Sequence, residues 1–285
     1  MSPMKTGRYF HLMRRTVRRI DTRSRLSLAA FSLAIMIGAG LSMPWIVKQS
    51  TGLSEDISFA FSPSAERAFE YGERHLNGMD VINYDLPRAR TYFYKAAALD
   101  PSLLYVHHQI ARIAFLQGDF GTALDHINLQ ISLHGDKTPS SYYVRGLIEG
   151  YIGDYAAAAK DYEYFLKFRP KNWAGINDYA WVLLKAGRHA EAAAATEEAL
   201  KYFPENPWLL NSSAIALYEL GDVPAAHERV QQAWRYVQAV EEDDWLNNYP
   251  GNDPAIAGEG IATFRAAVAD NMHRIELALA SSTVQ

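Results

Sequence analysis

Two asparagines with side chains suited to holding a peptide backbone, Asn177 and Asn211, lie 34 residues apart. A primary amide can donate a hydrogen bond to a backbone C=O and accept one from a backbone N–H, so a pair of them can grip an extended peptide. Arg112 and Lys185 offer positive charge to a carboxylate of the same ligand. The aromatic side chains that could pack against its side chains are Tyr143, Trp181 and Tyr218.

The motifs of common enzymes are missing from the sequence. It has no G-x-S-x-G, no glycine-rich phosphate loop and no H-E-x-x-H. The lack of cysteine excludes disulfides, thiolate metal sites and a cysteine nucleophile. His107 and His108 are consecutive on one predicted helix and cannot face the same way, so they form no recognisable zinc motif. We therefore expect a binding protein that is not an enzyme, with no cofactor and no metal.

A repeat positions these candidates. Five alanines recur at intervals of 34 or 35 residues, and four glycines recur at the same intervals, each five residues before its alanine. The alanines are Ala89, Ala123, Ala158, Ala192 and Ala226, and the glycines are Gly118, Gly153, Gly187 and Gly221. A fixed period in this range indicates a stacked array of helix pairs. The sequence therefore predicts an all-α solenoid.

Each repeat unit has a helix with apolar residues at helical spacing, a turn and a second helix. In the second to fifth units the turn bears Gly-Asp or Gly-Arg. The pattern resembles the tetratricopeptide repeat, with small residues at its eighth, twentieth and twenty-seventh positions and proline at its thirty-second. The resemblance covers about residues 64–240. It implies five helix pairs whose first helices line a concave groove, and a protein or peptide partner in that groove.

The five units are read from the spacing. Their approximate bounds are Ser64–Pro101, Leu104–His134, Pro139–Pro170, Trp173–Pro204 and Pro207–Val240. In the first unit, Asp85 is expected to cap the second helix, with Pro87 in its first turn. Gln130 and Phe165 stand where small residues are usual, so we expect the stacking of neighbouring helices to deviate there.

Five positions of each unit are expected to face the groove: the second, fifth, ninth, twelfth and thirteenth. The partner-binding candidates among them are Tyr105, His108, Arg112, Tyr143, Asn177, Trp181, Lys185, Trp208, Asn211 and Tyr218. Phe115, Ser140, Leu147, Gly150 and Tyr151 share these positions. Aromatic residues at helical spacing also form the core between repeats. The Lys/Asn/Asn/Lys/Arg set of the carboxylate-binding members of the family is incomplete here, so a C-terminal carboxylate is not inferred as the ligand.

The N-terminal region has a different composition. Residues 26–47 are 22 consecutive uncharged residues between Arg25 and Lys48, long enough at about 1.5 Å per residue to cross a bilayer core of roughly 30 Å. Residues 1–25 hold eight Lys or Arg and one Asp, a balance of +7. Because positive flanks stay in the cytoplasm, we expect a basic cytoplasmic tail, a single transmembrane helix and the array in the bacterial periplasm.

Other readings of this segment stay open. A cleaved signal peptide is one alternative, and a mitochondrial presequence, which would place the protein at the mitochondrial inner membrane, is another. Residues 48–63 are expected to form an irregular linker, because they contain Gly52 and Pro63 and show no evident helical period. From residue 51 onward 19 basic residues face 31 acidic ones, a balance of −12, which argues against nucleic acid as a partner.

After the fifth unit, residues 241–285 are expected to form a loop and a C-terminal helix. The acidic run at residues 241–244 is interpreted as a solvated loop. The alanine-rich amphipathic stretch from Pro254 to Ala280 is predicted to cover the last apolar face of the array, because a solenoid needs a capping element. The alternative is that this terminal helix docks a partner.

Together these features predict a membrane-anchored scaffold that binds peptide segments of partner proteins. The assembly, maturation or secretion of cell-envelope proteins is the natural setting, because tethering raises the local concentration of a weak binder. One alternative is a non-catalytic subunit of a membrane enzyme complex or an unrecognised hydrolase, and another is an adaptor that faces the cytoplasm.

Overall fold

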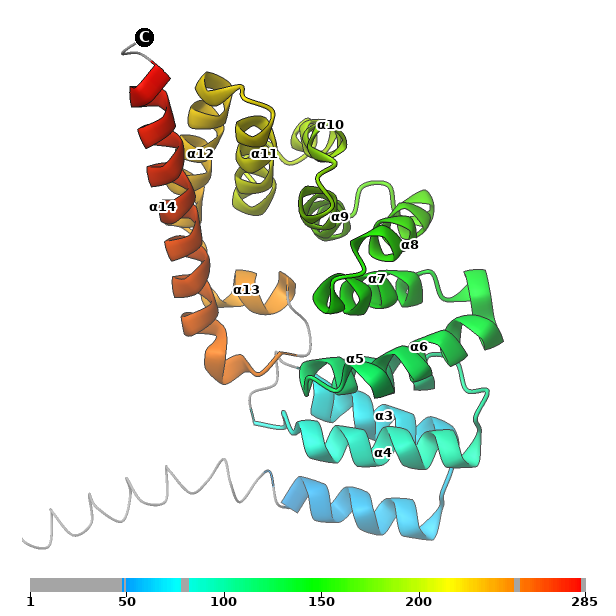
Figure 1. Ribbon diagram of the computed structural model, residues 1–285. Helices are drawn as coiled ribbons and strands as arrows, with labels where there is room; N and C mark the ends of the chain where they lie inside the picture. The colour runs from blue at the N-terminus through cyan, green and yellow to red at the C-terminus, as the bar shows by residue number, and fades with distance from the viewer. Residues whose placement is uncertain (1–47, 49, 78–81, 249–251, 283–285) are drawn as a thin grey trace, which may run out of the picture. The chain divides into compact units, whose positions relative to one another are not determined.

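The structure is a computed structural model that describes residues 48, 50–77, 82–248 and 252–282. Every regular element in these ranges is helical, as predicted (Figure 1). The predicted cytoplasmic tail, residues 1–25, and the predicted transmembrane helix, residues 26–47, lie outside the described residues. Among the residues that are described, no helix is long and apolar enough to cross a membrane. The chain divides into two compact units, residues 1–57 and 58–285.

A helix occupies residues 50–61, where the sequence analysis predicts an irregular linker. The helical period is faint in the sequence because only one residue in four carries it: Leu53, Ile57 and Phe61 follow each other at the spacing of one helix face. The glycine at position 52 lies within the helix and does not stop it. Pro63 stands just beyond its end, where proline is tolerated.

Five helix pairs follow within the second unit, in the order that the repeat predicts (Figure 1). The first helices are α3 (Ala65–Leu76), α5 (Val106–Leu116), α7 (Ser140–Ile152), α9 (Trp173–Lys185) and α11 (Pro207–Glu219). The second helices are α4 (Leu86–Leu99), α6 (Phe120–His134), α8 (Tyr155–Phe168), α10 (His189–Leu200) and α12 (Val223–Val237). Each helix packs against the next along the chain, so every pair is stacked on its neighbours.

The two sets of small residues have separate tasks in this packing. All five repeated alanines are 0% exposed, because they lie where the two helices of a pair approach closely. The four repeated glycines have φ between 73° and 89°, the left-handed region in which a side chain is strained. The period seen in the sequence is therefore the period of helix contacts and of the turns between helices.

Aspartates begin most of the second helices. The carboxylates of Asp119, Asp154 and Asp222 each accept a hydrogen bond from the backbone N–H three residues later, at 3.1 to 3.2 Å. Asp85 caps α4 in the same way at 3.1 Å, with proline in the first turn, as predicted. In α6, α8 and α12 the cap and the preceding glycine together fix where the second helix starts.

Gln130 and Phe165 are both buried, and neighbouring helices adapt to them. The Gln130 Oε1 atom accepts a hydrogen bond of 3.2 Å from the backbone N–H of His108, in the first turn of α5. This contact stands in for a cap, because Tyr105 precedes α5 with φ of 68° and no side-chain cap. Phe165 lies so close to Gly175 that a methyl group there would be 2.7 Å from its ring. A glycine in the next helix thus makes room for the Phe165 ring. The expected deviation in stacking stays a prediction.

The C-terminal region ends in the predicted capping helix. A short 3-10 turn, η2 (Pro254–Ile256), leads into α14 (Ala257–Ser282), which packs along α12 and reaches α11. Val268 and Ile275 are 0% exposed in the same core cluster as the last pair. The preceding segment is not the loop that was predicted, because α13 (Glu242–Asn248) forms there. Its acidic residues remain exposed, and the Asp244 carboxylate accepts the N–H of Glu241 at 3.0 Å, which favours a helix start.

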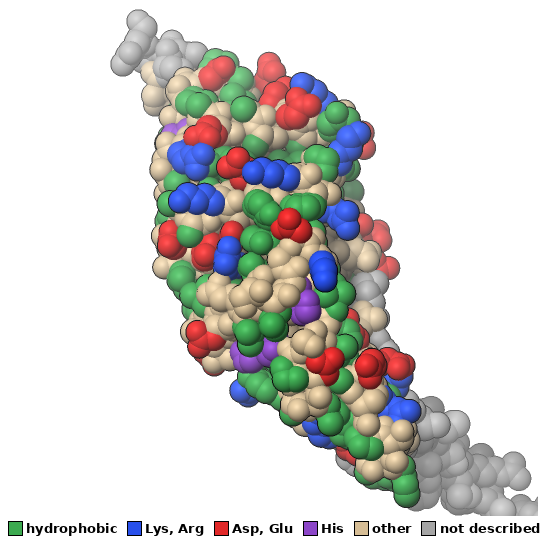
Figure 2. Space-filling view, turned by 90° about the vertical axis from the view of Figure 1, so that its right-hand side faces the viewer, with side chains coloured by type: hydrophobic (Ala, Val, Ile, Leu, Met, Phe, Trp, Pro, Cys, Tyr) green, Lys and Arg blue, Asp and Glu red, His purple; other side chains and the backbone are tan. Residues whose placement is uncertain are grey.

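Figure 2 shows acidic and basic side chains interspersed with apolar ones over the face that it displays. One ion pair between second helices joins Arg229 of α12 to Glu197 of α10 at 2.6 Å. Charges of both signs are therefore mixed on this face, and neither sign is gathered into a single patch there. The chemistry that distinguishes the protein lies instead among the first helices.

Candidate functional site

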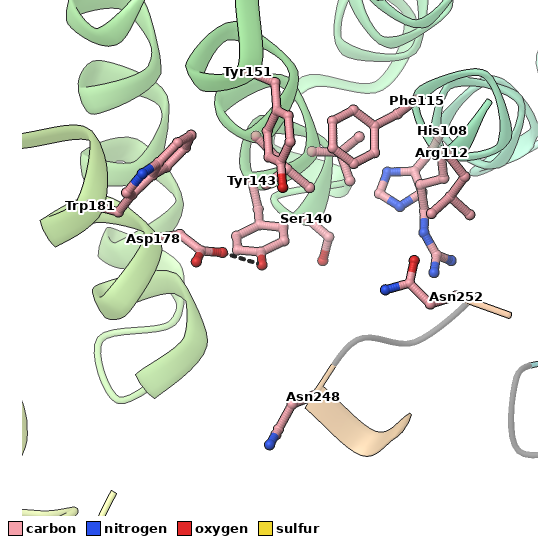
Figure 3. A pocket seen from close by; sticks show the side chains of 13 residues that line it. His108, Arg112, Phe115, Ser140, Tyr143, Tyr151, Asp178, Trp181, Asn248 and Asn252 are labelled. Carbon is pink, nitrogen blue, oxygen red and sulfur yellow. Dashed lines mark hydrogen bonds between the residues drawn. The ribbon is translucent and has the colours of Figure 1, made fainter. Parts of the chain in front are cut away.

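A cavity of about 480 Å³ opens on the first helices of the second, third and fourth units (Figure 3). Its lining residues come from α5, α7, α9 and the segment after α12. They are His108, Arg112, Phe115, Leu116, Ser140, Tyr143, Val144, Leu147, Tyr151, Asp178, Trp181, Asn248 and Asn252. Apolar side chains dominate and a few polar groups converge on the space, which is the usual composition of a binding site.

The first helices that form the cavity are joined by side-chain hydrogen bonds. One bond spans each successive pair of first helices, and a last one reaches α14. The bonds run between Gln109 Nε2 and Glu73, between His108 Nδ1 and Ser141 Oγ at 3.1 Å, from Tyr143 Oη to Asp178 Oδ2 at 2.6 Å, from Ser212 Oγ to Asn177 Oδ1 at 2.8 Å, and from Asn271 Nδ2 to Asn211 Oδ1 at 3.0 Å. We call this set the inter-unit bonds. They hold the cavity walls in register.

Asp178 supplies the acidic group of the cavity. Its carboxylate accepts a short bond from the Tyr143 hydroxyl, and the Asn177 amide lies 3.5 Å from its other oxygen. Burial raises the pKa of Asp178 to about 6, and these two neighbours only partly oppose that effect. Both neighbours are neutral groups. The carboxylate is therefore held in place without a positive partner among them.

Three aromatic rings form one wall of the cavity. The Phe115 and Tyr151 rings meet edge to face with centroids 5.0 Å apart, and the Tyr151 and Trp181 centroids are 5.6 Å apart. The indole lies directly on α7, because a methyl group at Gly150 would come within 2.7 Å of it. Tyr151 remains 60% exposed. An exposed aromatic ring beside a cavity offers a ligand a large apolar contact.

Arg112 supplies the basic group. Its Nη1 atom donates to the Gln109 side chain at 2.8 Å, and that side chain in turn donates to Glu73. Burial lowers the pKa of Arg112, while the Glu73 charge acts in the opposite direction. Burial likewise raises the pKa of Glu73. Arg112 is therefore linked to Glu73 of α3 through the Gln109 side chain. Figure 3 shows Arg112 across the cavity from Asp178.

The structure brings four of the ten predicted partner-binding candidates into the cavity: His108, Arg112, Tyr143 and Trp181. Three more lie outside it. Tyr105 packs edge to face on the His108 ring at 5.3 Å, Asn177 is engaged by the inter-unit bond to α11, and Lys185 is exposed at the end of α9.

The last three predicted residues lie against the chain's own terminal helix. The Trp208 ring stacks on Phe264 of α14 with centroids 4.9 Å apart. Asn211 bonds to Asn271 of α14, and the guanidinium of Arg274 lies 4.8 Å from the centre of the Tyr218 ring. Part of the groove predicted from the repeat is therefore filled by α14. The role of these three residues as partner contacts stays a prediction.

The sequence analysis did not name five residues that line the cavity: Leu116, Val144, Asp178, Asn248 and Asn252. Asp178 follows Asn177 directly, and a shift of one residue on a helix was enough to exclude it from the positions taken as inward. Asn248 and Asn252 lie outside the repeat, so no repeat position could assign them to the site. Phe115, Ser140, Leu147 and Tyr151 were at expected inward positions, and all four line the cavity.

His107, His108 and His126 have structural partners. His107 Nε2 lies 3.1 Å from the Pro101 carbonyl and its Nδ1 lies 3.0 Å from Nδ1 of His126, so the two rings satisfy each other. Among the described residues no group of three His, Cys, Asp or Glu side chains could hold a metal ion. Burial lowers the pKa of His108 to about 3, and its partner Ser141 is 0% exposed. That hydroxyl is out of reach of a substrate.

Comparisons with known proteins agree with this architecture. A model of the tetratricopeptide repeat family matches residues 183–242. No curated protein matches the sequence.

Three solved structures illustrate the shared fold. PilW, described as a widely conserved type IV pilus biogenesis factor, has a TM-score of 0.55 at 16% identity and covers 76% of this chain and 92% of its own. YrrB, described as a tetratricopeptide repeat protein with an unusual peptide-binding site, has a TM-score of 0.54 at 13% sequence identity. The match covers 64% of this chain and 91% of YrrB. A tetratricopeptide repeat protein from Parabacteroides merdae has a TM-score of 0.54 at 13% sequence identity, and the match covers 84% of this chain and 97% of that protein.

Identities this low establish the fold alone. The matched segment runs from the end of α9 through α12 and just beyond, and the helix pairs before it have the same construction. The chain thus carries a tetratricopeptide repeat in residues 183–242 and has the α-solenoid fold of tetratricopeptide repeat proteins.

Proposed function

We propose that this protein is a scaffold that binds an extended segment of a partner protein in the cavity formed by α5, α7 and α9. The observation that carries the proposal is the cavity itself, where an aromatic wall, one acid and one base converge on a space of about 480 Å³. Rigid helices joined by the inter-unit bonds hold these groups in place. A preorganised site of this kind loses little entropy when it binds a flexible segment.

The cavity is suited to binding, since its polar groups come from different helices. The Ser141 hydroxyl that bonds to His108 is buried and does not line the cavity. YrrB, which shares the fold, is described as having a peptide-binding site. That likeness supports a peptide as the class of ligand. The rival function, a non-catalytic subunit of an enzyme complex, would use the same surface but would copurify with an enzyme.

We further propose that residues 26–47 anchor the protein in a bacterial inner membrane, with the array in the periplasm and a role in assembling or exporting envelope proteins. The support is the uncharged run of 22 residues, the +7 balance before it and the −12 balance from residue 51 onward. PilW, a protein of the same fold, is described as a pilus biogenesis factor.

Crosslinking in cells tests the binding proposal. A photoreactive phenylalanine at Tyr151, which is 60% exposed on the cavity wall, is expected to capture the partner, and mass spectrometry would identify it. The matched control places the same group at Tyr202, which is 51% exposed beyond α10. Capture from position 202 without capture from position 151 would place the binding surface elsewhere.

A fusion tests the topology. Alkaline phosphatase joined to the C-terminus is active only after export, so an active fusion is expected. An expressed but inactive fusion would favour the cytoplasm-facing adaptor.

A further inference from the structure

Within the described part of the chain, the Asp178 carboxylate has no positively charged group among the groups that act on it. Removing a carboxylate from water is costly unless a cation or several donors replace the water. The groups that act on this carboxylate are the Tyr143 hydroxyl and the Asn177 amide, and neither carries charge. An ionised carboxylate has about four acceptor sites, so this one retains acceptor capacity on its cavity side.

The rings beside Asp178 favour the same kind of ligand. Trp181 and Tyr151 line the cavity together with Asp178, and their centroids are 5.6 Å apart. The face of an aromatic ring carries negative potential and attracts an ammonium or guanidinium group, most strongly when water is excluded. The carboxylate of Asp178 and the two aromatic rings therefore all attract a cation to the same side of the cavity.

The basic side of the cavity is separate. Arg112 is anchored by Gln109 and influenced by Glu73 of α3, and it is not among the groups that act on the pKa of Asp178. Figure 3 shows Asp178 and Trp181 on one side and Arg112 on the other. The positive charge of Arg112 thus leaves the acidic side available to a cation.

We propose that the Asp178 side of the cavity, walled by Tyr151 and Trp181, receives a lysine or arginine side chain of the partner segment. The proposal rests on the proposed peptide-binding function and specifies the chemistry of the segment. The methylene groups of a long basic side chain would lie against the rings, and its charged end would meet the Asp178 carboxylate.

The pKa of Asp178, raised to about 6, gives this binding a pH signature. A bound cation favours the ionised carboxylate, so binding below pH 6 must release a proton, and affinity is expected to rise from pH 5 to pH 7.5. The other titratable groups next to this carboxylate are the phenols of Tyr143 and Tyr151 on α7 and of Tyr162 on α8. Phenols do not change charge in this range.

Peptide pools test the proposal with the full-length chain in a non-ionic detergent. Each pool consists of fluorescein-labelled octapeptides with one fixed central residue and uncharged residues elsewhere, and the fixed residue is Lys, Arg, norleucine or Glu. The immobilised protein is expected to retain the Lys and Arg pools at least about fivefold more than the norleucine pool. That preference should weaken at pH 5.

Three variants show whether Asp178 and its rings cause the preference. Asp178→Asn keeps an acceptor for the Tyr143 hydroxyl and is expected to abolish the preference. Trp181→Leu keeps the charge and should reduce the preference about threefold. Asp270→Asn removes an equal charge from an exposed position on α14 and should leave it unchanged. Circular dichroism would confirm that each variant is folded.

The outcomes separate this inference from the function on which it rests. Equal retention of the norleucine and Lys pools would disprove the cation site while peptide binding stands, and so would a preference that survives Asp178→Asn. Preferred retention of the Glu pool would assign recognition to Arg112 and overturn the inference as well. Retention of no pool above the empty support would contradict both the cation site and peptide binding in this cavity.

Discussion

The fifth positions of four units can be compared directly, because His108, Tyr143, Asn177 and Asn211 are 34 or 35 residues apart. In each unit this residue bonds to the next element along the array. At α5 and α7 the space beside that bond is an open cavity, whereas at α11 it is filled by α14. A repeat position therefore determines where a side chain points, and the next element along the array determines whether a partner can reach it.

The open cavity and the end of the array covered by α14 each contain a tryptophan. Replacing these two residues is expected to show the largest difference in stability between the two regions. Trp208 is 7% exposed and stacks on Phe264 of α14, so Trp208→Ala should lower the free energy of unfolding by about 3–5 kcal/mol. Trp181 lies at the open cavity, and Trp181→Ala should cost clearly less. Urea unfolding followed by circular dichroism measures both. An equal loss of unfolding free energy in the two variants would mean that Trp181 contributes to the core as much as Trp208 does.

The attachment of α13 to α14 offers a second test. A methyl group at Gly260 would lie 2.3 Å from the Trp245 ring, so Gly260→Ala must displace α13, which carries Asn248 of the cavity. We expect a loss of about 1–3 kcal/mol. Gly258→Ala is the matched control, because its methyl group would meet only a Glu242 side-chain oxygen at 3.4 Å. Helix propensity should make that variant more stable by up to about 1 kcal/mol.

The acid of the open region should make stability depend on pH. Because the pKa of Asp178 is about 6 in the folded protein and 3.8 ordinarily, its contribution to stability is present below pH 4 and is lost as pH rises through 6. Burial also raises the pKa of Glu149, to about 7, which acts in the same direction. Asp178→Asn should remove only its own share, about 1–3 kcal/mol between pH 4 and pH 7.5. An unchanged slope in unfolding experiments would contradict this.

The smallest effects are expected at the two asparagines. Each side chain makes one inter-unit bond, so Asn177→Ala and Asn211→Ala should each cost about 0.5–1.5 kcal/mol in thermal or urea unfolding. Neither lines the cavity, so capture by a crosslinker at position 151 should persist. If capture is lost in the double variant while stability is retained, the asparagines grip the partner themselves, as the sequence analysis predicted.

The sequence was sufficient for the features that repeat locally. The spacing of alanine and glycine predicted the five helix pairs, and Asp85 with Pro87 predicted the start of α4. It was insufficient for contacts made by segments outside the repeat. Nothing near Trp208 indicated that Phe264, more than fifty residues later, would cover it, because that contact depends on how α14 returns along the array.

The candidate site shows the same division. His108, Arg112, Tyr143 and Trp181, whose positions follow from the period of the repeat, all line the cavity. Asp178 was missed, although it is adjacent to a predicted residue. Its importance comes from burial and from the Tyr143 hydroxyl, and neither can be read from the spacing of residues.

The inter-unit bonds have a mechanical consequence. They join successive first helices on the side of the array that carries the cavity, from α3 through to α14. Any motion that straightened the stack would pull those helices apart and stretch every bond, whereas motion that tightened the stack would not. The array should therefore resist motions that separate the first helices and yield more easily to motions that bring them together around a bound ligand.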